Sequence, residues 1–162
     1  MSKSKTKVKI GDIIAIPIGE NKYGFSQLID GDKLNGCYIV FDIISREYLP
    51  IHSIIEKPIL FMVFTSAFKI VNGDWKIIGN EKVPECIKIP LFKVDVAHDG
   101  LIETMITDFK GNTLRKATEE EVRTLSTMSS YTAVVMENAI MAKFGMTPWK
   151  EHYNALLYKD SK

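Results

Sequence analysis

Residues 68–77 read Phe-Lys-Ile-Val-Asn-Gly-Asp-Trp-Lys-Ile, and this segment carries the strongest local signal in the chain. Apolar side chains alternate with polar ones on both sides of Asn72-Gly73. Asn and Gly tolerate the positive φ angles that a two-residue type I′ turn requires. The pattern predicts a β-hairpin folded at Asn72-Gly73, with Trp75 as a core anchor after the turn. The first part of the chain is therefore expected to consist mostly of antiparallel strands.

The residues before this hairpin predict further strands, at 13–18, 22–29, 37–44 and 59–66. The segment 22–29 alternates with a period of two, which predicts a strand with one buried face and with Ser26 on the exposed one. The segment 37–44 is apolar apart from Asp42, as expected for a strand buried on both faces. The segment 59–66 is the candidate for the centre of the sheet. Between the last two, isoleucines at helical spacing in 51–55 predict a short helix.

The residues after the predicted Asn72-Gly73 hairpin first have the alternating pattern of strands and then change to a helical period. Alternation in 87–91 and 101–107, with Asp99-Gly100 as the turn, predicts a second hairpin, and Gly111-Asn112 predicts one more turn. Thr118 and Glu121 have the spacing of a capping box at a helix start. Helices are also expected at 131–144, ending at Gly145, and from Pro148 onward. The fold class predicted is α+β: an N-terminal, mostly antiparallel, bent β-sheet or small barrel with C-terminal helices packed on it.

Composition limits the organisation of the chain and the classes of function. The 162 residues carry a net charge of +1, with 46% hydrophobic and 25% charged residues, which is typical of a globular protein. We expect a basic flexible N-terminal tail at 1–9 and a single domain at 10–160. Nucleic acid is not favoured as a partner, because proteins that hold it through phosphate contacts are usually far more basic. Trp149 is expected in the core.

The cellular compartment is also predicted from the sequence. The longest apolar run, 59–64, is far too short to span a membrane, which needs roughly 18 residues or more. Two cysteines, Cys37 and Cys86, each in an apolar stretch, are expected to be buried, reduced thiols. The protein is therefore expected to be soluble and cytoplasmic, and its oligomeric state stays open.

A search for catalytic constellations gives no specific candidate. The three histidines are scattered, and the best ligand-like cluster, Asp95, His98 and Asp99, lies beside a turn where polar residues are expected anyway. Ser26 lacks the second glycine of a nucleophile elbow. We therefore predict no catalytic residue, no cofactor site and no metal site, and expect the protein not to be an enzyme.

A series of short motifs resembles immunity protein family 26, the immunity 26/phosphotriesterase HocA family, over roughly residues 8–157. The motifs lie at 11–17, 23–24, 40–42, 59–61 and 75–79, followed by Pro148-Trp149. The resemblance implies an antitoxin of a bacterial polymorphic toxin system, which binds one cognate toxin domain and blocks it. The phosphotriesterase label has no support in the residues, because metal-dependent hydrolysis needs a cluster of His and carboxylate ligands.

If the toxin is a basic nuclease, acidic residues are the expected contacts. We select Asp42 and the run Glu119, Glu120 and Glu121. The alternatives are an SH3-like nucleic-acid or ribosome-associated binding module, suggested by residues 11–14 and the lysines of 1–9, and a small phosphotriesterase-like hydrolase.

Overall fold

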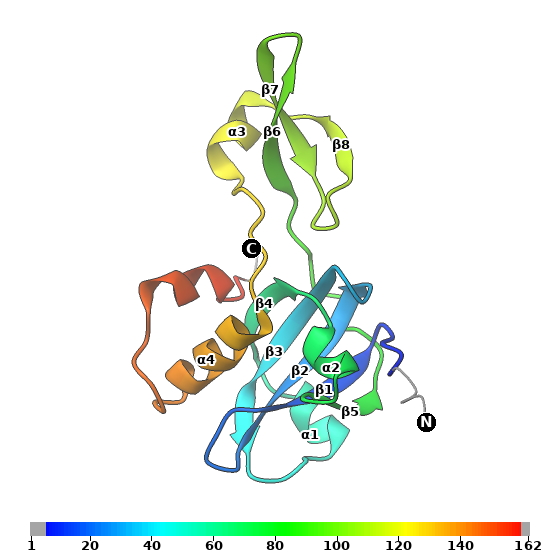
Figure 1. Cartoon of the computed structure of the whole chain (residues 1–162), viewed down its shortest axis with the longest axis vertical. Helices are drawn as coiled ribbons and strands as arrows, with labels where there is room; N and C mark the ends of the chain where they lie inside the picture. Colours follow the sequence, from blue (N-terminus) through cyan, green and yellow to red (C-terminus); the bar gives the residue numbers. More distant parts are fainter. Residues whose placement is uncertain (1–5, 160–162) are drawn as a thin grey trace. The chain divides into compact units, whose positions relative to one another are not determined.

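The computed structural model describes residues 6–159. They form two compact units: unit 1 comprises the chain up to Pro84 and again from Tyr131, and unit 2 comprises Glu85–Ser130. Both units are built on antiparallel sheets, and helices accompany each of them (Figure 1), so the predicted α+β class is confirmed. The single domain at 10–160 stays a prediction. Of the expected basic tail, residues 1–5 lie outside the described part, while Lys7 and Lys9 are exposed.

Unit 1 contains an open five-stranded sheet in the order β4-β3-β2-β1-β5. Its strands are β1 (Asp12–Pro17), β2 (Tyr23–Gly31), β3 (Gly36–Ser45), β4 (Ile59–Thr65) and β5 (Lys76–Asn80). The central strand is β2, so the prediction that 59–66 forms the centre is wrong. An edge strand can be this apolar because the chain covers its free edge: Tyr131 donates its N–H to Phe64 (2.9 Å), and Tyr158 donates to Leu60 (3.0 Å).

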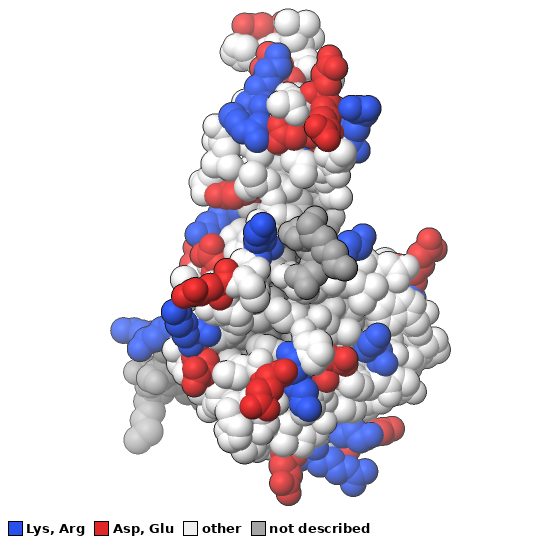
Figure 2. Space-filling view, turned by 180° about the vertical axis from the view of Figure 1, so that it is seen from behind, with Lys and Arg blue, Asp and Glu red and all other residues white. Residues whose placement is uncertain are grey.

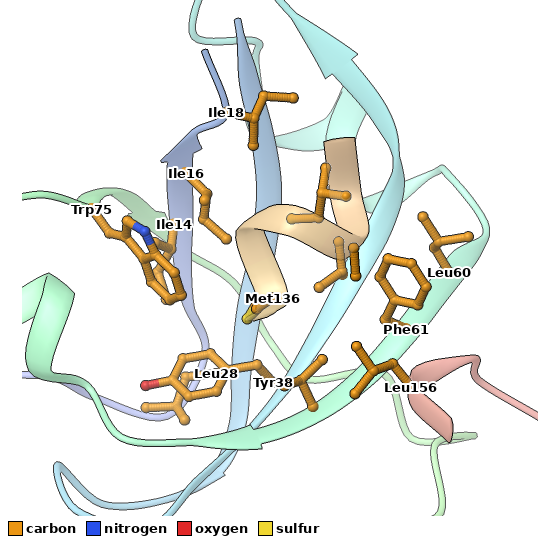
Figure 3. Close-up of a cluster of buried hydrophobic side chains, with 14 of the residues drawn as sticks. Ile14, Ile16, Ile18, Leu28, Tyr38, Leu60, Phe61, Trp75, Met136 and Leu156 are labelled. Atoms are coloured by element: carbon orange, nitrogen blue, oxygen red, sulfur yellow. The ribbon is translucent and has the colours of Figure 1, made fainter. Parts of the chain in front are cut away.

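The helices of unit 1 are α1 (Ile51–Ile55), α2 (Phe68–Val71), α4 (Ala133–Lys143) and the 3₁₀ helix η1 (Glu151–Leu156). The core contains Met136 and Ile140 from α4. Figure 3 shows Met136 together with core side chains of β1, β2, β3 and β4. The strand β2 is buried on both faces, which contradicts the exposed face predicted for 22–29. Ser26 is 0% exposed and donates to the Ile39 carbonyl at 2.8 Å. The absence of a side chain at Gly24 leaves room for α4, since a Cβ at Gly24 would meet Ile140 at 3.1 Å.

The predicted hairpin at Asn72-Gly73 is wrong. Residues 68–71 form the short helix α2, which is followed by β5, and β5 pairs with β1 rather than with 68–71. Gly73 does have a positive φ of 89°, and its N–H donates to the Ile70 carbonyl at 3.1 Å. Because a left-handed glycine ends a helix as readily as it closes a type I′ turn, the same two residues fit both structures.

The two tryptophans have different environments. Trp75 is 1% exposed, and its indole N–H donates to Glu137 Oε1 at 2.9 Å, so the predicted core anchor is confirmed. Trp149 is 39% exposed, so the prediction that it lies in the core is wrong. Its ring stacks against that of Phe61, with the ring centroids 6.2 Å apart. It precedes η1, which begins at Glu151 rather than at Pro148 and is a 3₁₀ helix.

Unit 2 contains a three-stranded sheet in the order β6-β7-β8, with β6 (Phe92–His98), β7 (Leu101–Thr107) and β8 (Thr113–Lys116), and the helix α3 (Glu119–Thr124). The turn at Asp99-Gly100 and the capping box of Thr118 and Glu121 are confirmed. Residues 87–91 form no strand, because Pro84 and Pro90 restrict the segment and lack the N–H groups of a ladder. Cys86 directly precedes this segment and is exposed, so the prediction that it is buried is wrong, whereas Cys37 is buried as predicted.

Candidate interaction surfaces

Asp42 lies on β3 at an irregularity in the pairing with β2. Gly24 pairs with Ile44 while Ser26 pairs with Val40, so β3 bulges between these partners. A bulge re-aims side chains, and Asp42 is exposed although the residues before it in β3 are buried. Its N–H donates to the Pro58 carbonyl at 2.9 Å, and no described residue pairs with its carboxylate. The carboxylate is therefore available to a partner and needs no buried donor.

The run Glu119, Glu120 and Glu121 forms the first turn of α3 in unit 2. Both oxygens of Glu121 accept hydrogen bonds of 2.7 Å from Arg115, and Oε1 also accepts the Thr118 N–H. The Arg115 hydrogen bonds, followed by that backbone bond, lower the pKa of Glu121 to about 2. Glu121 therefore stabilises α3, whereas the carboxylates of Glu119 and Glu120 are exposed and pair with no described residue. The predicted contacts belong to different units.

The cluster Asp95, His98 and Asp99 occupies the β6–β7 hairpin. His98 Nε2 lies 3.3 Å from Asp99 Oδ2 with both side chains more than 80% exposed, and Asp95 accepts a 2.7 Å hydrogen bond from Thr104. Within residues 6–159, no group of three or more His, Cys, Asp or Glu side chains has the arrangement of a metal site. No helix of the same residues is long and apolar enough to cross a membrane.

This hairpin also has an exposed apolar surface that was not predicted from the sequence. We call residues 95–104 the hairpin tip; in Figure 1 it extends past α3 and β8 within unit 2. Leu101 is 70% exposed, Ile102 is 75% exposed and Val96 is 40% exposed. The signal was present in the sequence: two large apolar residues directly after a turn must point to opposite faces of a ribbon, and a ribbon that short has no core to bury them.

On the face seen from behind, the described charged side chains are of both signs, and basic and acidic ones are interspersed (Figure 2). One ion pair of unit 1 is partly buried: Lys69 Nζ lies 2.8 Å from Glu137 Oε1, with side-chain exposures of 24% and 18%. This pair joins α2 to α4 and is structural.

Comparison with known proteins identifies the family. The model of Immunity protein 26 matches residues 9–99, more than half of the chain, and the chain belongs to this family. The matched residues include all five strands of unit 1 and the strand β6 of unit 2. The family suggested by the short motifs is thereby confirmed. The comparisons with curated proteins and with solved structures found no match.

Proposed function

We propose that this chain is a cytoplasmic immunity protein of a polymorphic toxin system that binds one cognate toxin domain and neutralises it by stoichiometric inhibition. The observation that carries the proposal is membership of the Immunity protein 26 family over residues 9–99. The family describes an immunity protein, and immunity requires a toxin as partner. A nuclease is one toxin class that fits, because its substrate-binding surface is basic and suits acidic contacts.

Inhibition by binding requires a complementary surface and no active site of the inhibitor. A stable interface buries about 1,600 Å² in total, and a few residues at its centre supply most of the free energy. Unit 1 offers the unpaired carboxylate of Asp42, and unit 2 offers Glu119, Glu120 and the hairpin tip. The net charge of +1 and the interspersed charges favour a protein partner over nucleic acid.

The test is co-expression of this chain with the toxin domain encoded by the neighbouring reading frame. We expect restored growth, a 1:1 complex on gel filtration, and protection that ends when the toxin exceeds the immunity protein in molar amount. A catalytic mode would instead protect at substoichiometric amounts. Loss of protection with a chelator would favour the hydrolase alternative, and salt-dependent retention of RNA would favour the nucleic-acid alternative. Failure to rescue growth, with no complex formed, would reject the proposal.

A further inference from the structure

The hairpin tip has exposed apolar side chains that the fold of unit 2 does not need. Ile106, in the part of β7 that pairs with β8, is 0% exposed, whereas Leu101 and Ile102 at the other end are 70% and 75% exposed. Exposed apolar side chains on a β-ribbon favour aggregation, and native proteins usually replace them unless they bind something. Their position at the end of a hairpin makes them accessible to a partner from both faces of the ribbon.

The tip is also acidic. Between residues 94 and 109 the sequence contains no Lys or Arg, while Asp95, Asp99 and Glu103 all fall within the tip. These carboxylates are exposed, and the cation nearest to Glu103 is Lys116 of β8, at 3.8 Å and 72% exposed. His98 lies 3.3 Å from Asp99, but this pair and the Lys116–Glu103 pair are exposed to solvent, and exposed pairs are weak. A surface with apolar side chains among such exposed carboxylates is complementary to a partner with a basic rim around an apolar depression.

The geometry of the hairpin is fixed before any partner binds. Every residue of β6 pairs with a residue of β7, from Phe92 with Thr107 to His98 with Leu101. The turn residues have φ angles of 48° at Asp99 and 77° at Gly100, as a type I′ turn requires. Lys93 also donates to Ser126 and Val122 carbonyls at 3.1 and 2.6 Å, which ties the base of the hairpin to α3. A preorganised element loses less entropy on binding than a loop of equal size.

We infer that the hairpin tip is the element with which this protein contacts its toxin, and that the toxin domain presents a basic surface around an apolar depression at that contact. This inference rests on the proposed function. It assigns the apolar centre of the interface to Leu101 and Ile102 and the steering charges to Asp95, Asp99 and Glu103.

The experiment measures binding of the full chain to the purified toxin domain from the neighbouring reading frame, in an inactive form. The double variant Leu101→Thr/Ile102→Thr keeps strand-compatible residues and should raise Kd about 100-fold, mainly through faster dissociation. The triple variant Asp95→Asn/Asp99→Asn/Glu103→Gln should slow association about tenfold and flatten its dependence on salt. Leu34→Thr is the matched control, because Leu34 is 71% exposed but belongs to unit 1, and it should bind like the unmodified chain.

The outcomes separate this inference from the proposed function. If the unmodified chain does not bind the toxin, the proposed function fails and the inference with it. If the unmodified chain binds and both tip variants bind equally well, only the inference is overturned, and Asp42→Asn and Glu119→Gln/Glu120→Gln then locate the contact. Dimers of the free protein that dissociate in the Leu101/Ile102 variant, with toxin binding unchanged, would also overturn it. If the Leu101→Thr/Ile102→Thr variant misfolds, the Asp95→Asn/Asp99→Asn/Glu103→Gln variant still tests the inference.

Discussion

The two units are built from similar antiparallel strands but are stabilised differently. In unit 1, β2 is buried on both faces and the core includes residues from four strands and from α4. In unit 2, the strand β8 is exposed throughout, and local bonds such as the capping box and the Arg115–Glu121 pair hold the elements. Burial of apolar area contributes far more free energy than exposed hydrogen bonds do. The difference indicates a stable body in unit 1 and a thinner unit 2 that presents side chains to solvent.

The strongest test of this difference compares the reactivity of two cysteine thiols, Cys37 in unit 1 and Cys86 in unit 2. Burial, and next the Asp30 carboxylate, raise the pKa of Cys37 far above its ordinary value, whereas Cys86 is exposed. Cys86 should react with Ellman's reagent at the rate of a free thiol. In the Cys86→Ser variant, Cys37 should react on the order of 1,000-fold more slowly, because its reaction requires opening of unit 1. Two equally fast thiols would mean that unit 1 opens readily.

The next largest expected effect is the loss of stability when a tryptophan of unit 1 is replaced. Trp75→Ala should lower the free energy of unfolding by about 3–5 kcal/mol, because it removes a large, fully buried side chain. Trp149→Ala should cost less than about 2 kcal/mol, since that side chain is 39% exposed. Urea unfolding followed by circular dichroism measures both. Equal costs for the two variants would contradict the burial difference.

Glu137 links elements of unit 1 through a single carboxylate oxygen. Its Oε1 accepts from Lys69 at 2.8 Å and from Trp75 at 2.9 Å. Glu137→Ala should destabilise by about 1–3 kcal/mol, because the indole N–H and the ammonium both lose a partly buried acceptor. Glu137→Gln keeps an acceptor for Trp75 and should cost less, which urea unfolding of the pair will measure. A larger cost for the Gln variant would argue against the shared-acceptor explanation.

In unit 2, loss of the helix cap should have a smaller and local effect. Thr118→Ala removes the acceptor for the Glu121 N–H and should cost about 1 kcal/mol in the stability of α3. Hydrogen exchange should become faster at the amides of α3 while those of β2 and β3 in unit 1 keep their protection. Faster exchange in both units would show that they unfold together.

The smallest expected effect is the pH dependence of the contribution that Glu121 makes to the stability of α3. The pKa of Glu121 is about 2 in the folded chain against an ordinary value of 4.5, so its stabilisation is complete above pH 4.5 and is lost as the pH falls towards 2. NMR signals of Arg115 and α3 should report loosening across this range. Glu121→Gln should remove that dependence, whereas Glu119→Gln, an exposed neighbour on the same turn, should retain it.

Features that depend on a few adjacent residues were predictable from the sequence. The capping box of Thr118 and Glu121, the turn at Asp99-Gly100, the left-handed Gly145 and the helix at 51–55 all form as expected. Each depends on backbone dihedral preferences and short-range hydrogen bonds, which the local sequence specifies. The family also followed from short motifs in order. The candidate contacts Asp42 and Glu119–Glu121 could be selected from the sequence by their charge. Their exposure to solvent could not be predicted from it.

Tertiary structure decided which faces are covered and which strands are neighbours. Asn72-Gly73 ends a helix because β5 pairs with β1, and that pairing depends on residues about 60 positions away. Ser26 is buried because it lies opposite Ile14 and Val40, which belong to the core that includes α4. Cys86 is exposed, and the segment between Pro84 and Pro90 joins no sheet. The sequence by itself determined the fold class, the local turns and caps, and the family. Burial, strand order and the exposed hairpin tip depend on long-range packing, because an apolar or small side chain has no intrinsic preference for the element that covers it.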